Sequence, residues 1–287
     1  MSSLSTRWSN QFNPDSPLSE YPRPQLRRPV WLCLNGRFDY AVRPASEDTP
    51  EYFDGEIIVP YCIESALSGV EKPLLPGQAL WYRRRFSVGS EFAGKRTMLH
   101  FGAVDWSCRV FVNGTPAGEH RGGYCPFSFD ITHLLNNQGD NELLVRVEDP
   151  TDTGSQPRGK QVLKTRGFWY TATSGIWQTV WLEPVDECRV ARLRIIPDID
   201  RSSVTVATET STDNCRVFAK ISDGPDTVFS GEIGKHKCIA IPTPKYWSPE
   251  SPFLYDIEIE IKQDGHVNDS VQSYFGMRKY SVGADAR

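Results

Sequence analysis

Paired carboxylates are the side chains of this sequence that come nearest to a catalytic arrangement. Glu148, Asp149 and Asp152 lie within the segment VEDPTDTG. Cleavage of a glycosidic bond by a retaining enzyme needs one carboxylic acid and one carboxylate about 5 Å apart. The Asp-Pro-Thr-Asp spacing is equally typical of a turn that leaves a strand, where aspartate side chains accept hydrogen bonds from free backbone N–H groups. We favour the turn over a catalytic pair. We also favour it over a calcium-binding loop, which would need more oxygen ligands than this segment supplies.

Nucleophiles and metal ligands lack the patterns that their chemistry needs. There is no G-x-S-x-G, and the nearest segments, LSGV and TSGI, lack its first glycine. The five histidines form no H-E-x-x-H or H-x-x-x-H, and the seven cysteines form no C-x-x-C. We therefore predict no catalytic residue, no metal site and no cofactor. An odd number of widely spaced cysteines favours reduced, partly buried thiols.

Aromatic side chains are concentrated in RGFWYTATSGIWQTVWLEPV, residues 166–185, and the polar segment QPRGKQ lies just before it. Sugars stack their flat C–H faces on Trp and Tyr rings and use their hydroxyl groups to bind polar side chains. Burial in a core is the competing explanation, and it accounts for most of the tryptophans in a β protein. Seven side chains are candidates for substrate binding: Asp105, Trp106, Arg158, Lys160, Gln161, Trp169 and Tyr170.

The elements that must position these side chains are short strands. From Trp31 onward, apolar or alternating runs are interrupted at regular intervals by turn residues, which is typical of an all-β fold. In NELLVRVED, Leu143, Val145 and Val147 alternate with other residues, as in a strand with one buried face. Asn113-Gly114 predicts a hairpin, because both central residues of its turn need positive φ.

The chain of 287 residues is long enough for two domains. Residues 1–30 contain five prolines, which disfavour helix and strand alike, and we expect an extended arm over the first domain. Residues 31–185 form the first predicted sandwich. Residues 186–283 form a second one, with the size and strand rhythm of an immunoglobulin-like domain.

Charge and hydropathy exclude two classes of partner. The net charge is −4 and no run of Lys or Arg exceeds three residues, so we predict no binding to nucleic acid. No stretch of about 18 consecutive apolar residues occurs, and the N-terminus lacks the apolar segment of a signal peptide. We therefore expect no membrane association and a cytoplasmic location.

Seven motifs occur in the order and spacing of a known family. They run from about Trp31 to Val282 and resemble the N-terminal half of glycoside hydrolase family 2, the β-galactosidase and β-glucuronidase family. The motifs are LWYRRRF, FGAVDWSCRVFVNG, GEHRGGYCPFSFDITHLL, NELLVRVEDPTD, TSGIWQTVWLEPV, YWSPESPFLY and YFGMRKYSV.

The resemblance implies a fold and a missing part. It predicts a jelly-roll, galactose-binding-like sandwich, then an immunoglobulin-like sandwich, and in the family a TIM barrel with two catalytic glutamates follows. The barrel needs about 250 further residues. We therefore expect residues 284–287 to begin a linker to a barrel supplied in the same chain or by another chain. The catalytic glutamates map onto no residue of this sequence, and the oligomeric state is left open.

One position departs from the relatives. The galactosidase and glucuronidase branches are similar in placing an Asp five residues before the small residue of the SGI motif, where it reaches the sugar. Here that position is Trp169, which argues against either specificity. Farther along, strand alternation puts Ile176, Val180 and Leu182 on one side and Trp177 and Trp181 on the other, so the two tryptophans are candidates for a domain interface.

Taken with the resemblance, the residues predict the non-catalytic N-terminal part of a family 2 glycoside hydrolase, with a β-glycoside as its carbohydrate partner. Such a chain would contribute to domain packing and to the rim of the substrate site. A stand-alone carbohydrate-binding protein, or an adaptor without hydrolase activity, is the alternative.

Overall fold

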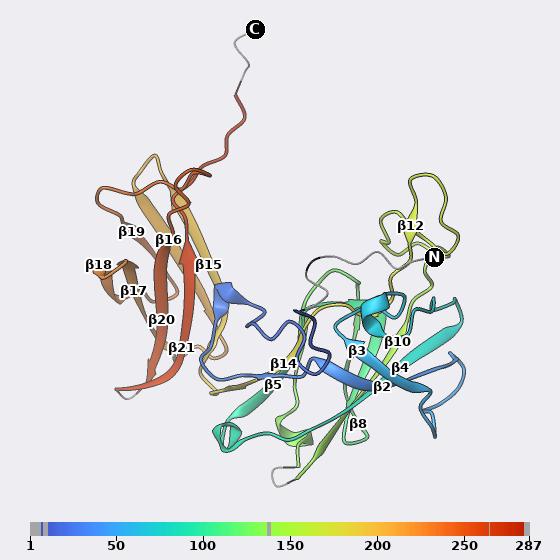
Figure 1. Ribbon diagram of the computed structural model, residues 1–287. Coiled ribbons are helices and arrows are strands. Elements are labelled where there is room, and N and C mark those ends of the chain that lie inside the picture. The colour runs from blue at the N-terminus through green and yellow to red at the C-terminus, as the bar shows by residue number, and fades with distance from the viewer. Residues whose placement is uncertain (1–6, 8–10, 137–138, 264, 284–287) are drawn as a thin grey trace. The chain divides into compact units, whose positions relative to one another are not determined.

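The computed structural model describes residues 7, 11–136, 139–263 and 265–283. They divide into two compact units (Figure 1). The first unit comprises the described residues up to Pro22 together with Val30–Pro184, and the second comprises Arg23–Pro29 and the described residues from Val185 onward. In the described part of the chain, the helices are short 3₁₀ turns, at Pro24–Leu26, Ala66–Ser68, Ser90–Phe92 and Thr132–Leu134. The predicted all-β class is confirmed.

Two antiparallel sheets build the first unit. The larger sheet has the order β3(Gly55–Val59), β2(Gly36–Pro44), β4(Gln78–Phe86), β10(Asn141–Glu148), β7(Ser107–Val112) and β8(Thr115–Arg121). The smaller one has the order β1(Leu32–Cys33), β14(Val180–Val185), β5(Arg96–Phe101) and β9(Phe127–Asp130).

Alternating apolar side chains of both sheets form one core. Leu143, Val145 and Val147 are fully buried in it, as the alternation in β10 predicted. The hairpin between β7 and β8 turns at Asn113 and Gly114, whose φ angles are 51° and 77°, so the predicted Asn-Gly turn is confirmed. Burial of this alternating set is what holds the two sheets together.

Two small sheets extend the first unit. In one, β6(Val104–Asp105) pairs antiparallel with β13(Gly175–Ile176). In the other, β11(Gln161–Val162) pairs parallel with β12(Tyr170–Thr171), inside a loop that projects beyond the strands of the larger sheet (Figure 1). Gly175 has a φ of 95°, and a Cβ atom there would lie 2.0 Å from the hydroxyl oxygen of Tyr82. Only glycine therefore fits where the loop returns to the core.

The second unit is a smaller sandwich of seven strands. One sheet has the order β15(Val190–Asp198), β16(Ser203–Thr210) and β19(His236–Ala240). The other has the order β18(Asp226–Glu232), β17(Arg216–Asp223), β20(Tyr255–Gln263) and β21(His266–Phe275). Ile257, Ile259 and Ile261 of β20 are buried in its core. Seven short antiparallel strands in two sheets are the architecture of an immunoglobulin-like domain.

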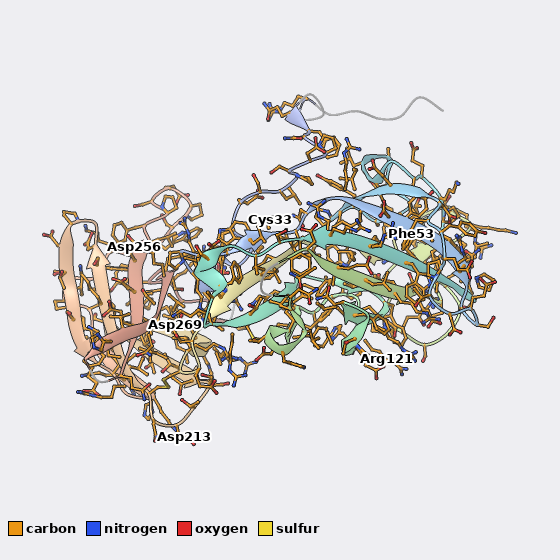
Figure 2. All side chains as sticks on the ribbon, turned by 90° about the horizontal axis from the view of Figure 1, so that it is seen from below. Cys33, Phe53, Arg121, Asp213, Asp256 and Asp269 are labelled. Atoms are coloured by element: carbon orange, nitrogen blue, oxygen red, sulfur yellow. A yellow bond between two sulfur atoms is a disulfide. The ribbon has the colours of Figure 1, made fainter. Side chains whose placement is uncertain are left out.

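The N-terminal arm divides between the two units. Its described residues up to Pro22 belong to the first unit, as expected, whereas residues 23–29 belong to the second. Leu26 is buried in the second core, and the backbone of Arg27 pairs with Gln272. The buried Arg28 guanidinium makes two hydrogen bonds, of 2.9 and 2.8 Å, to the carboxylate of Asp269, which lies on β21 (Figure 2). A buried Arg needs a carboxylate partner, and this one lies 241 residues away, too far for local sequence patterns to reveal.

The cysteines also differ from the expectation of seven reduced thiols. Cys188 and Cys215 form a disulfide in the second unit, with their Cα atoms 6.1 Å apart. The two cysteines are 27 residues apart in sequence, so only the folding of the sandwich brings them together. The other five, Cys33, Cys62, Cys108, Cys125 and Cys238, are free.

Candidate functional site

Three carboxyl groups meet where β6, β10 and β13 approach one another at one end of the first unit. We call Glu64, Asp105 and Asp149 the carboxyl cluster. Asp105 is 4% exposed and Asp149 is 5% exposed. Residue 175 pairs with Asp105 across the small sheet, which places the SGI motif directly against the cluster. Gly123 lies so close to Asp105 that a Cβ atom there would be 2.4 Å from Oδ1.

Ser174 joins two members of the carboxyl cluster. Its hydroxyl group donates to Asp149 Oδ2 at 2.7 Å, and its backbone N–H donates to Glu64 Oε2 at 2.9 Å. The other oxygen of Asp149, Oδ1, accepts from the backbone N–H of Thr151 at 2.8 Å. Asp152 accepts from the backbone N–H of Leu163 at 3.1 Å. The turn interpretation of the segment VEDPTDTG is therefore confirmed, because both aspartates cap backbone N–H groups.

Gln161 connects the cluster to the projecting loop. Its side chain donates a hydrogen bond to Asp105, and its Nε2 also donates to the hydroxyl oxygen of Tyr124 at 3.2 Å. Its Oε1 accepts from both the backbone N–H and the hydroxyl group of Thr173, at 2.7 and 2.9 Å. All the polar atoms of this amide have partners, so the loop has a fixed point of attachment.

Burial dominates the electrostatics of the cluster. It raises the pKa of Asp105 to about 7, and the nearby Asp149 and Glu64 charges act in the same direction, while the hydrogen bond from Gln161 opposes them. Burial also raises the pKa of Asp149 and of Glu64. A carboxyl pair with a raised pKa is a feature of glycosidases, but here Asp105 and Asp149 are buried, and Asp149 and Glu64 accept backbone hydrogen bonds. Their geometry suits a scaffold for the loop.

The loop of residues 152–173, which we call the rim loop, presents aromatic rings to solvent. Phe168 and Tyr170 are 64% and 65% exposed. Phe168 stacks on Trp169 with ring centroids 5.0 Å apart, and Lys160 Nζ lies 5.5 Å from the centroid of Phe168. The backbone N–H of Tyr170 donates to the Lys160 carbonyl oxygen at 2.9 Å, which holds β11 and β12 together.

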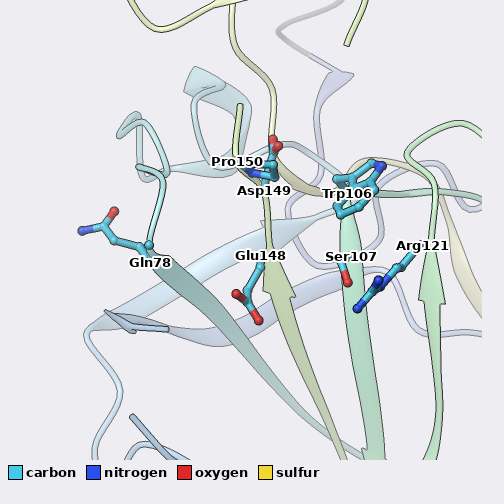
Figure 3. A pocket seen from close by; sticks show the side chains of 8 residues that line it. Gln78, Trp106, Ser107, Arg121, Glu148, Asp149 and Pro150 are labelled. Carbon is cyan, nitrogen blue, oxygen red and sulfur yellow. The ribbon is translucent and has the colours of Figure 1, made fainter. Parts of the chain in front are cut away.

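A shallow pocket of ≈ 230 Å³ lies at the ends of β4, β10, β7 and β8 (Figure 3). Glu148 is opposite Ser107, and Ser107 is opposite Arg121, so polar side chains from three adjacent strands lie in one row. The pocket is lined by Gly77, Gln78, Trp106, Ser107, Arg121, Glu148, Asp149 and Pro150. Among the described residues that line the pocket, Trp106 is the one aromatic side chain.

The candidates from the sequence fall into two places. The carboxyl cluster and the rim loop bring together Asp105, Gln161 and Tyr170, since Gln161 bonds to Asp105 and pairs with Tyr170. Lys160 and Trp169 both contact Phe168 in the same loop.

Arg158 is half-buried in the same loop, where its Nη1 donates to the Gly154 carbonyl oxygen at 3.4 Å. Trp106 contributes to the pocket instead.

Sequence reasoning missed four residues of the site. Tyr124 and Gly123 lie in the motif GEHRGGYCPFSFDITHLL, which carries the family resemblance but from which no site residue is predicted. Phe168 was part of the aromatic stretch but was not selected, although it is the most exposed ring there apart from Tyr170. Glu64 carried no local signal, because its partner Ser174 is 110 residues away.

The two tryptophans of the predicted interface have different surroundings. Ile176, Val180 and Leu182 belong to the first core, as the alternation predicted. Trp177 is half-buried, donates from Nε1 to the Gly123 carbonyl oxygen at 2.8 Å and makes an edge contact with Tyr124.

Trp181 is 3% exposed. It stacks on His100 at 4.8 Å, and its Nε1 donates to Glu183 Oε1 at 2.8 Å. Both rings lie outside the core cluster that contains Ile176. An interface role for them stays a prediction.

In the described ranges of the chain, no three His, Cys, Asp or Glu side chains are placed to hold a metal ion. Over the same ranges, no helix combines the length and apolar character needed to cross a membrane.

Comparison with known proteins finds two matching family descriptions. Residues 188–278 match "Glycosyl hydrolases family 2", and residues 71–178 match "Glycosyl hydrolase 2 galactose-binding domain-like". A β-galactosidase of Thermoanaerobacter pseudethanolicus is 26% identical over 222 residues, which are 72% of this chain and 29% of that protein. A β-galactosidase of Bacteroides ovatus is 28% identical over 76% of this chain and 26% of its own length. The chain thus spans under a third of these relatives.

Solved structures show the same fold. A β-glucuronidase from Ruminococcus gnavus superposes with a TM-score of 0.74 at 19% identity, over 89% of this chain and 48% of that one. A β-glucuronidase from Lactobacillus rhamnosus superposes with a TM-score of 0.70 at 21% identity, over 88% and 45%. The order of the two sandwiches therefore matches that of these proteins.

Proposed function

This chain belongs to glycoside hydrolase family 2, whose N-terminal domains it contains, and from this premise we propose that it forms the sugar-facing, non-catalytic part of a β-glycosidase. In this proposal, the rim loop borders the substrate site. Its attachment through Gln161 to the carboxyl cluster supports this role, since a binding loop recognises its ligand best when its base is rigid.

The exposed rings of the rim loop are the observation that carries the proposal. Phe168 and Tyr170 are more than 60% exposed, next to polar and cationic side chains. Exposing two large aromatic rings to water costs free energy, because their apolar surface is hydrated. A sugar face stacked on the rings would remove part of that surface from water. Trp169, where an Asp stands in the relatives that it resembles, lies beneath Phe168 and supports it.

Catalysis would come from elsewhere. Glycoside hydrolysis requires two accessible carboxyl groups on opposite sides of a glycosidic bond. The carboxyl cluster offers no such pair, because Asp105 and Asp149 are buried, which leaves Glu64 as its one partly exposed carboxyl group. We therefore assign the acid and the nucleophile to a TIM-barrel domain, in this protein or in a partner.

The test combines a hydrolysis assay with a binding assay on the purified 287-residue chain. We expect no release of p-nitrophenol from p-nitrophenyl β-glycosides. We also expect glycan binding that weakens in Tyr170→Ala. The matched control is Tyr246→Ala, which removes a comparably exposed tyrosine from the second unit. Hydrolysis by the chain, free of host enzymes, would contradict the non-catalytic assignment.

The same binding assay separates the alternatives. Glycan binding by the chain that does not change when a barrel domain is added favours a stand-alone carbohydrate-binding protein, because the exposed rings then need no barrel to act. Glycan binding that becomes tighter when a barrel domain is added favours the sugar-site rim. A stable complex with another protein, without glycan binding to either form, favours an adaptor.

A further inference from the structure

The rim loop carries a local charge opposite to that of the whole chain. The chain has 32 Lys and Arg against 36 Asp and Glu, a net charge of −4. Between Asp152 and Glu183, however, the sequence contains no carboxylate and four cations: Arg158, Lys160, Lys164 and Arg166. The four cations lie within nine residues, all in the rim loop.

These cations have no carboxylate partners among the described residues. In the described part of the molecule, none of the four forms an ion pair. Exposed cations elsewhere do pair, as in Arg216 with Glu232 at 2.7 Å and Lys245 with Asp223 at 2.7 Å. A concentration of unpaired like charge destabilises the loop slightly by mutual repulsion, and an external anion would remove that cost.

The loop geometry places the charges beside the open rings. Lys160 lies 5.5 Å from the centroid of Phe168, and its carbonyl oxygen accepts from Tyr170. The Arg166 carbonyl oxygen accepts from the backbone N–H of Trp169 at 3.0 Å, closing the turn that carries the rings. All four cations therefore precede the exposed rings of Phe168 and Tyr170 in the sequence, with Lys160 beside Phe168 and Arg166 at the start of the turn.

We propose that the rim loop binds a polyanionic glycan, one with negative groups on more than one sugar. The open rings stack on a sugar face, and the four cations pair with carboxylate or sulfate groups on the same and neighbouring sugars. The four cations are spread over nine residues, and one carboxylate can contact only some of them. A ligand with several anionic groups therefore fits better than a ligand with one. This inference rests on the proposed function, because it names the class of glycan that the same loop recognises.

Calorimetric titration of the 287-residue chain tests the inference with three hexasaccharide probes: oligogalacturonate, which carries carboxylates, carrageenan, which carries sulfates, and neutral cellohexaose. We expect the anionic probes to bind at least tenfold more tightly than the neutral one, since several exposed ion pairs add their modest contributions. Raising NaCl from about 0.1 to about 1 M should abolish most of the difference, because the screening length falls from about 10 to about 3 Å.

A triple variant, Lys160→Gln with Lys164→Gln and Arg166→Gln, should lose about tenfold in affinity for the anionic probes and little for the neutral one. It keeps the backbone hydrogen bonds of the turn. The matched control removes three exposed cations elsewhere: Lys72→Gln, Arg194→Gln and Lys220→Gln. Thermal melting checks that both variants fold.

The outcomes are distinguishable. Equal binding of neutral and anionic probes, still lost in Tyr170→Ala, overturns the polyanion inference and leaves the proposed function standing. An equal loss of affinity for the anionic probes in the control variant also overturns the polyanion inference, because the net charge of the chain would then explain the binding. Binding of none of the probes overturns both the inference and the sugar-facing role. Preference between the two anionic probes identifies carboxylate or sulfate as the group that is recognised.

Discussion

The carboxyl cluster makes a specific prediction about pH. Burial raises the pKa of Asp105 to about 7 from its ordinary value of 3.8. Between these two values the folded protein holds a proton that the unfolded chain has released. The free energy of unfolding therefore falls as pH rises from about 4 to about 7, and it stays level above the folded pKa.

The magnitude follows from the shift. Each unit is worth about 1.4 kcal/mol, so about three units correspond to at most about 4 kcal/mol. Solvent screening of a group that retains some contact with water reduces this, and we expect a loss of about 2 kcal/mol between pH 5 and pH 8. Asp105→Asn removes the titration while keeping the shape of the side chain.

Urea unfolding followed by tryptophan fluorescence measures the effect. The stability of the Asp105→Asn variant relative to the natural chain should rise by about 2 kcal/mol from pH 5 to pH 8. Asp256→Asn, which changes an exposed aspartate on β20 (Figure 2), is the matched control for the loss of a carboxylate outside the cluster. A difference for Asp105→Asn that stays flat across this range would refute the electrostatic description of the cluster.

Three further predictions concern the framework of the two units. Gly175→Ala should destabilise the first unit by about 2 kcal/mol or more, since its φ is 95° and a Cβ atom there meets a tyrosine hydroxyl group, and a lowered melting temperature would show it. Arg28→Ala should cost about 3 to 5 kcal/mol because it leaves the buried Asp269 carboxylate unpaired, whereas a loss under about 1 kcal/mol in urea unfolding would contradict this. Cys188→Ala should destabilise the second unit by about 3 kcal/mol, from the loss of a closed loop of 27 residues, and dithiothreitol should lower the melting temperature of the natural chain but not of the variant.

The sequence predicted features whose cause is local. Alternation in β10 placed Leu143, Val145 and Val147 in the core because side chains of a strand alternate between its two faces. Asn113-Gly114 predicted its hairpin because the turn needs positive φ at both positions. The turn at VEDPTDTG followed from the same kind of short-range chemistry, since Asp149 accepts from the backbone N–H of Thr151, two residues farther along.

Features that depend on distant partners were not predictable. The Arg28–Asp269 pair spans 241 residues, and the contact of Glu64 with Ser174 spans 110. The cysteine count favoured free thiols because sequence spacing does not report which strands become neighbours. The aromatic content of the rim loop was evident, but exposure decides its role, and a single sequence does not show which of Phe168, Trp169 and Tyr170 reach solvent.

Hydroxyl-radical footprinting of Phe168 and Tyr170, with and without a glycan hexasaccharide, tests the central claim most directly. Both rings are exposed, so both should be oxidised readily in the free chain. If the rim loop faces sugar, the glycan should protect both rings while the exposed Tyr246 and Tyr280 keep their reactivity. Unchanged oxidation of Phe168 and Tyr170 at saturating glycan, or protection confined to other residues, would contradict the account.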